Sequence, residues 1–154
     1  MKFTFNEFEM VITNRTTEKP ISTPEQAVEF LRRHAGFSSV ERFFVVPLDA
    51  RNAPSGFVLV SQGTLSASLV HPREVFRVAI HLGAAAILIA HNHPSGNVSP
   101  SDEDRTITKR LAQAGELLGV RLLDHVIFTD SESYSFADHN PDFLDGSKKG
   151  GAES

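Results

Sequence analysis

Two histidines and an aspartate in the stretch HNHPSGNVSPSDED, residues 91–104, are the side chains best suited to chemistry. His91 and His93 are two residues apart, so on a strand their imidazoles point to the same face and can share a metal ion. Asp104, at the end of the stretch, adds a carboxylate. Three protein ligands leave one coordination position for water, as in catalytic rather than structural zinc sites. Because zinc lowers the pKa of such a water to about 7, this spacing predicts metal-assisted hydrolysis.

The segments around these residues are expected to bring them together. The apolar run AAAILIA, residues 84–90, leads directly into His91 and predicts a strand covered on both faces. The Pro-Ser-Gly turn at residues 94–96 ends that strand. Residues 101–119 then form a helix, and Asp104 lies in its first turn. The helix therefore returns the carboxylate to the end of the strand, where ligands of α/β proteins tend to bind.

Each residue of this set also has a simpler explanation. A His-x-His pair alone is a weak signal, because many such pairs are surface or core histidines. Ser101 and Asp104 alone are explained by helix capping, since acidic side chains are favoured in the first turn. The combination of the buried strand, the paired histidines and the returning acid favours a metal site over these separate explanations.

The rest of the chain alternates between strand and helix patterns. We expect strands at residues 1–13, 41–50, 57–65, 120–130 and 133–138, and helices at residues 23–36 and 72–83 in addition to the one above. This order predicts an α/β chain, with a mixed sheet flanked by about three helices. We divide it into an N-terminal strand and connector at 1–19, a single domain at 20–138, and a flexible polar tail at 139–154.

Composition limits the possible classes of protein. The 154 residues suggest one domain, and the net charge of −4 argues against a dedicated nucleic-acid binder. The chain has no cysteine, so any metal must be held by histidine and carboxylate side chains. The N-terminal residues do not resemble a signal peptide, and no window is apolar enough for a membrane span. We therefore expect a cytoplasmic protein without a membrane partner.

The stretch from His91 to Asp104 fits the pattern His-x-His-Pro, six residues, Ser-x-x-Asp. This is the JAMM motif of the JAB/MPN metalloproteases. The segment HNHPSG is preceded by VHPREVF and followed by LLDHVI. With these three segments the chain resembles the RadC family over roughly residues 20–137. The resemblance implies a JAB/MPN fold, with a curved mixed sheet between helices, and a zinc ion held by His91, His93 and Asp104.

The resemblance also implies two catalytic residues. The family motif has an upstream glutamate that takes a proton from water, and we favour Glu41, which opens the strand ERFFVVPL. Glu74 is the alternative, although a preference for acids at helix starts explains it. Ser101 matches the motif serine, which stabilises the tetrahedral intermediate. The implied reaction is hydrolysis of a peptide or isopeptide bond, with Glu41 acting first as general base and then as general acid.

Two other functions remain open. The domain could be a non-catalytic JAB-type protein-binding module, although such modules usually lose the ligands that this chain keeps. It could also be a DNA-repair-associated factor, as the family name suggests. Longer RadC proteins carry an N-terminal helical region that this chain is too short to hold. The expected partner is a peptide or protein substrate, direct nucleic-acid binding is not expected, and both a monomer and a homodimer are left open.

Asp124 and His125 form a further acidic and imidazole pair on a predicted strand. An internal pair between the two side chains is the first interpretation. If that strand neighbours the metal site, either residue could orient a metal-bound histidine through its second ring nitrogen.

Overall fold

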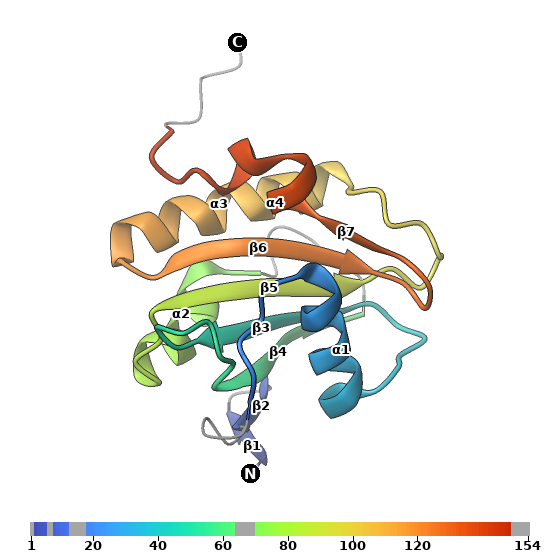
Figure 1. Cartoon of the computed structure of the whole chain (residues 1–154), viewed down its shortest axis with the longest axis horizontal. Coiled ribbons are helices and arrows are strands. Elements are labelled where there is room, and N and C mark those ends of the chain that lie inside the picture. The colour runs from blue at the N-terminus through green and yellow to red at the C-terminus, as the bar shows by residue number, and fades with distance from the viewer. Residues whose placement is uncertain (1, 6–7, 13–17, 64–69, 149–154) are drawn as a thin grey trace.

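The computed structural model describes residues 2–5, 8–12, 18–63 and 70–148 (Figure 1). The strands are β1 (Lys2–Phe5), β2 (Phe8–Ile12), β3 (Arg42–Leu48), β4 (Gly56–Gln62), β5 (Ala86–Asn92), β6 (Arg121–Phe128) and β7 (Ser133–Ser135). The helices are α1 (Pro24–Ala35), α2 (Pro72–His81), α3 (Asp102–Leu118), α4 (Phe136–His139) and the 3-10 helix η1 (Pro141–Leu144). Within the described ranges, no helix combines the length and apolar character needed to cross a membrane.

The strands form one seven-stranded sheet in the order β1-β2-β4-β3-β5-β6-β7. β5 and β6 are parallel, whereas the other neighbouring strands are antiparallel. The prediction of a mixed sheet flanked by helices is therefore confirmed. The parallel pair lies next to β3, so strands far apart in the sequence meet at the centre of the sheet.

Alternation along the strands separates two apolar cores, one on each face of the sheet. Residues of α2 and α3 cover one face, where they pack against Phe43, Val45, Ile87, Ile89 and neighbouring side chains. Residues of α1 cover the other face, which is the front face in Figure 1, and pack against Phe44, Val46, Leu88, Ala90 and their neighbours. His91 follows Ile87 and Ile89 in this alternation, so its ring is directed to the α3 side.

The two longest helices begin where the sequence predicts. Thr23 and Gln26 form a capping box at the start of α1, in which each side chain accepts a backbone N–H of the other residue. Ser101 and Asp104 form the same arrangement at the start of α3. The α3 helix ends at Gly119, whose φ of 72° is the left-handed conformation that glycine favours. Capping thus fixes Asp104 in the first turn of α3.

Three predicted segments differ from the structure. Residues 1–13, expected as one strand, contain the two strands of an antiparallel hairpin. In the segment 133–138 the strand stops at Ser135, whose side chain accepts the Asp138 N–H and starts α4. The tail expected from residue 139 contains η1, which packs Leu144 against the α2–α3 core.

Candidate metal centre

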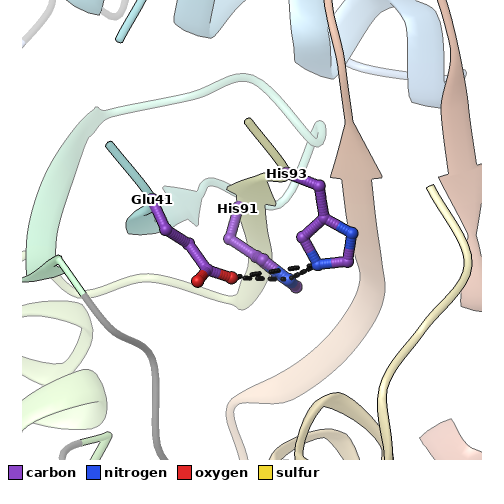
Figure 2. Close-up of side chains that lie close together, drawn as sticks. All are labelled: Glu41, His91 and His93. Atoms are coloured by element: carbon purple, nitrogen blue, oxygen red, sulfur yellow. Dashed lines mark hydrogen bonds and ion pairs between the residues drawn. The ribbon is translucent and has the colours of Figure 1, made fainter. Parts of the chain in front are cut away.

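The end of β5 brings the two predicted histidines together (Figure 2). His91 is completely buried, and His93 lies just past the strand end with its side chain mostly buried. Their Nε2 atoms are 2.8 Å apart. The prediction that both imidazoles share one face at the end of a buried strand is therefore confirmed.

Asp104 faces the same two nitrogen atoms from the first turn of α3. Its Oδ1 lies 3.1 Å from His91 Nε2, and its Oδ2 lies 3.4 Å from His93 Nε2. Burial favours a higher pKa for the Asp104 carboxyl, but hydrogen bonds with the two histidines outweigh it and hold that pKa well below its ordinary value. The hydrogen bond with Asp104 in turn raises the pKa of His93. A buried carboxylate anion thus faces both imidazoles.

Glu41 completes the group from the neighbouring strand. It directly precedes β3, whose Phe43 is paired with His91 across the sheet. The Glu41 Oε1 atom lies 3.7 Å from His91 Nε2 and 3.8 Å from His93 Nε2. The alternative, Glu74, is on α2, where its carboxylate pairs with Arg73 and Arg77. The structure therefore brings Glu41, rather than Glu74, to the histidines.

Ser101 lines an open groove of about 400 Å³ together with Glu41, His93 and Asp104. Its Oγ accepts the Asp104 N–H at 3.1 Å, and its own N–H donates to Asp104 Oδ2 at 2.8 Å. The hydroxyl oxygen is thus the acceptor in the cap, so the hydroxyl proton remains available for a ligand in the groove.

A backbone carbonyl orients His93. Its Nδ1 lies 2.7 Å from the carbonyl oxygen of Asn97, in the turn between β5 and α3. Since a carbonyl only accepts hydrogen bonds, Nδ1 must carry the proton, and in the neutral ring Nε2 then carries the lone pair. This contact could not be predicted from residue types, because any residue can supply a main-chain oxygen.

The strand β6 adjoins the site, but its Asp124 and His125 side chains do not form the predicted pair. Asp124 accepts the Ser135 hydroxyl at 2.6 Å and the backbone N–H groups of Ala137 and His125 at 2.9 and 2.7 Å. His125 instead lies behind His91, with its Nε2 2.8 Å from His91 Nδ1. This geometry fits the other expectation, that a residue of β6 orients a histidine of the site, because His125 contacts the second ring nitrogen of His91.

The environment of Asp124 predicts a pH-dependent stability. Burial raises the pKa of this carboxyl, although the hydrogen bonds from Ser135 and two N–H groups oppose the shift. The folded state then binds the proton more tightly than the unfolded state, so stability decreases as the pH rises through the folded-state pKa. Asp124→Asn removes this titration. Its melting temperature relative to the wild type is expected to rise as the pH increases above about 4, the ordinary pKa of an aspartic acid.

Thermal unfolding of the two proteins across that pH range measures the effect, and a difference that stays constant with pH would contradict it. Asp124→Ala is a useful comparison, because it leaves the Ala137 N–H without its acceptor. We expect a loss of about 1–3 kcal/mol from that change.

The side chains present fit a divalent metal ion. One oxygen of Glu41 and one ring nitrogen of each of His91 and His93 all lie within 4.8 Å of one another. Asp104 adds a second carboxylate, whose oxygens are closer to both nitrogens than Glu41 is. Imidazole nitrogen and carboxylate oxygen are ligands of zinc and of several other first-row metals. The two histidines and the buried carboxylate therefore form a group that could hold a divalent metal ion, beside a groove lined by His93 and Asp104.

Comparison with known proteins assigns the family. Residues 21–141 match the family model described as RadC-like JAB domain. The chain therefore belongs to the RadC-like JAB domain family, and the mixed sheet with flanking helices is its JAB-type α/β fold.

Bacterial relatives support the same assignment. A UPF0758 protein of Symbiobacterium thermophilum is 47% identical over 116 residues, which are 75% of this chain and 50% of the relative. A UPF0758 protein of Trichlorobacter lovleyi is 43% identical over 79% of this chain and 53% of the relative. A UPF0758 protein of Rubrobacter xylanophilus is 50% identical over 70% of this chain and 47% of the relative. The chain thus spans about half the length of the curated relatives it matches.

Proposed function

We propose that the chain is a zinc-dependent peptidase or isopeptidase of the JAMM type. The observation that carries this proposal is the convergence of His91, His93 and Asp104 with the carboxylate of Glu41 at an open groove. Two histidines and one aspartate match the ligands of catalytic zinc sites, which use three protein ligands and leave one position free.

Each side chain has a role in this proposal. His91, His93 and Asp104 would hold the ion. A bound zinc ion supplies a Lewis acid and lowers the pKa of water at the site. Glu41 takes the proton from the attacking water and then returns it to the leaving amine. Ser101 donates a hydrogen bond from its hydroxyl to the oxyanion that develops at the scissile carbonyl.

The surface around His93 supports a chain-like substrate. His93 and Pro94 line the groove that contains Glu41 and Ser101, and they also line a second groove of about 390 Å³. The second groove extends past Phe37 and Arg42 to Thr129. A peptide whose scissile bond lies at His93 thus has room on both sides, which a small substrate would not need.

Peptide hydrolysis by the zinc-loaded chain tests the proposed function. The protein would be loaded with one equivalent of zinc and incubated with a mixture of linear peptides and of peptides branched through a lysine ε-amine. Mass spectrometry would identify new termini. We expect cleavage that stops when a chelator removes zinc and returns when zinc is restored. Cleavage that persists without metal, or no cleavage of either class by zinc-loaded protein, would refute the proposal.

Ser101→Ala separates the two roles of this serine. Loss of one oxyanion donor is expected to lower kcat by about 10²- to 10³-fold. Loss of the cap is expected to lower the free energy of unfolding by about 1 kcal/mol. Ser101→Thr keeps both the hydroxyl and the capping oxygen, so it should retain most of both properties. Steady-state kinetics well below the melting temperature, together with urea unfolding, measure the two effects, and an unchanged kcat in Ser101→Ala would rule out the oxyanion role.

A further inference from the structure

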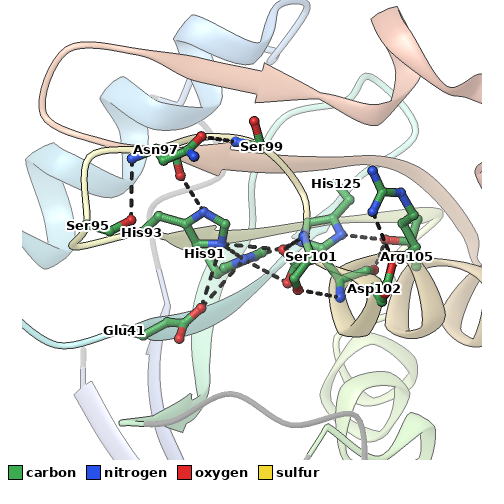
Figure 3. A network of polar contacts seen from close by, with 12 residues as sticks. Glu41, His91, His93, Ser95, Asn97, Ser99, Ser101, Asp102, Arg105 and His125 are labelled. Atoms are coloured by element: carbon green, nitrogen blue, oxygen red, sulfur yellow. Dashed lines mark hydrogen bonds and ion pairs between the residues drawn. The ribbon is translucent and has the colours of Figure 1, made fainter.

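A series of three hydrogen bonds connects His91 to the backbone of Asp104 through two fully buried side chains. Figure 3 shows His91 and His125, with which this series begins. The His91 Nδ1 atom lies 2.8 Å from His125 Nε2. The His125 Nδ1 atom lies 2.6 Å from the hydroxyl of Thr108. That hydroxyl donates to the carbonyl oxygen of Asp104 at 2.6 Å. The series therefore joins β5, β6 and α3 directly behind the candidate metal ligands.

The last acceptor, a backbone carbonyl, determines which atom donates in each of these three hydrogen bonds. A carbonyl cannot donate, so the single hydroxyl proton of Thr108 points to Asp104. The Thr108 oxygen must then accept from His125, which places the His125 proton on Nδ1. A neutral imidazole has one N–H, so His125 Nε2 is an acceptor and His91 must donate to it from Nδ1. The remaining nitrogen of His91, Nε2, consequently carries a lone pair.

We propose that Thr108 and His125 are positioning residues that hold His91 in the Nδ1–H tautomer and so present its Nε2 to the metal ion. This inference rests on the proposed function for the identity of the ion as zinc. The Asn97 carbonyl imposes the same tautomer on His93. Both Nε2 atoms therefore point to one place beside the Asp104 carboxylate, 2.8 Å apart, where either a proton or a metal ion would be held between them.

Packing prevents the rings from turning away from this arrangement. The ring of Phe136 stacks on His125, with centroids 5.0 Å apart and an interplanar angle of 9°. The ring of Phe43 stacks on His91, with centroids 5.9 Å apart and an angle of 22°. A flip of either imidazole would exchange its ring nitrogens with carbons and break the series of hydrogen bonds. The site thus has its ligand geometry fixed before metal binds, which is how outer hydrogen bonds raise metal affinity.

Zinc affinity of conservative variants tests the inference. Thr108→Val keeps the shape of the side chain but removes the hydroxyl, and Thr108→Ser restores it. We expect competition with a chromophoric chelator to show a loss of zinc affinity of about 10-fold or more in Thr108→Val, and near wild-type affinity in Thr108→Ser. His125→Leu should lose about 10- to 100-fold, whereas His125→Gln should lose less, because its amide oxygen can accept from His91 Nδ1. A zinc affinity equal to that of the wild type in all four variants would overturn the proposal.

The tautomers can also be read in the unmodified chain. Long-range ¹H–¹⁵N correlation spectra should show His125 and His91 protonated at Nδ1, with and without zinc. A His125 protonated at Nε2 would reverse the donors and acceptors in this series of hydrogen bonds. That result would overturn the inference even if the variants failed to fold. The failure of the proposed function is a different result. Tight zinc binding that depends on Thr108 but gives no peptide hydrolysis would leave the positioning role intact and refute the peptidase.

Discussion

Replacement of His93 or Asp104 by alanine is expected to remove bound zinc while the chain stays folded. The wild type should retain about one zinc ion per chain, and each variant should retain almost none, because two remaining protein ligands do not make a stable zinc site. His93 lies past the end of β5, outside the apolar cores, so its removal should not disturb the sheet. Elemental analysis of protein purified without chelator or affinity-tag histidines measures the zinc content.

Asp102→Ala is the matched control for Asp104→Ala. Both acids lie in the first turn of α3, where either charge stabilises the helix N-terminus. The Asp102 side chain is exposed and pairs with Arg105, whereas Asp104 is buried against the histidines. We therefore expect Asp102→Ala to keep its zinc. Zinc that remains in folded His93→Ala and Asp104→Ala would show that the ion binds elsewhere, and no uptake by the wild type would leave the domain without its proposed metal.

Local patterns predicted the parts of the site that lie close together in the sequence. The apolar run before His91 identified a buried strand, and the spacing of His91 and His93 placed both rings on one face. The capping pattern placed Ser101 and Asp104 at the start of α3, and the resemblance to the JAMM motif implied their roles. These inferences succeed because strand alternation and helix capping depend on residues within one turn or one strand of each other.

Contacts between distant strands were harder to predict. Glu41 meets the histidines only because β3 and β5 are paired with Phe43 opposite His91, and that register cannot be read from either strand alone. His125 is a sharper case. Val120 and Leu122 pack on the α3 side of the sheet, whereas Val126 and Phe128 pack on the α1 side. If the alternation continued regularly from Leu122, the side chain of His125 would point to the α1 side.

An irregularity in β6 reverses that alternation. The pairing of β5 with β6 shifts where Ile87 and Leu88 lie opposite Leu122 and Asp124. The additional residue moves His125 to the α3 face, where it contacts His91 and Thr108. Bulges of this kind are common beside active sites, because they redirect one side chain without ending the strand. The sequence around Leu123 has no glycine or proline to mark it.

Glu41→Gln is expected to abolish turnover while zinc stays bound. The amide has nearly the same shape as the carboxylate but cannot accept the proton of the attacking water, so kcat should fall by about 10²- to 10⁴-fold. Glu74→Gln is the matched control, because Glu74 pairs with arginines on α2, and its kcat should stay unchanged. Steady-state hydrolysis of the same peptide by zinc-loaded proteins measures both.

Zinc content of the same variants distinguishes a base from a ligand, since the site offers two carboxylates to one ion. Asp104 has the shorter contacts, 3.1 and 3.4 Å against 3.7 and 3.8 Å for Glu41, and its side chain is 1% exposed against 26%. A buried carboxylate beside two imidazoles suits a permanent ligand, whereas a partly exposed one at the groove can exchange protons with water. We therefore expect Glu41→Gln to keep its zinc and Asp104→Ala to lose it. If Glu41→Gln lost zinc and Asp104→Ala kept it, the two assignments would have to be exchanged.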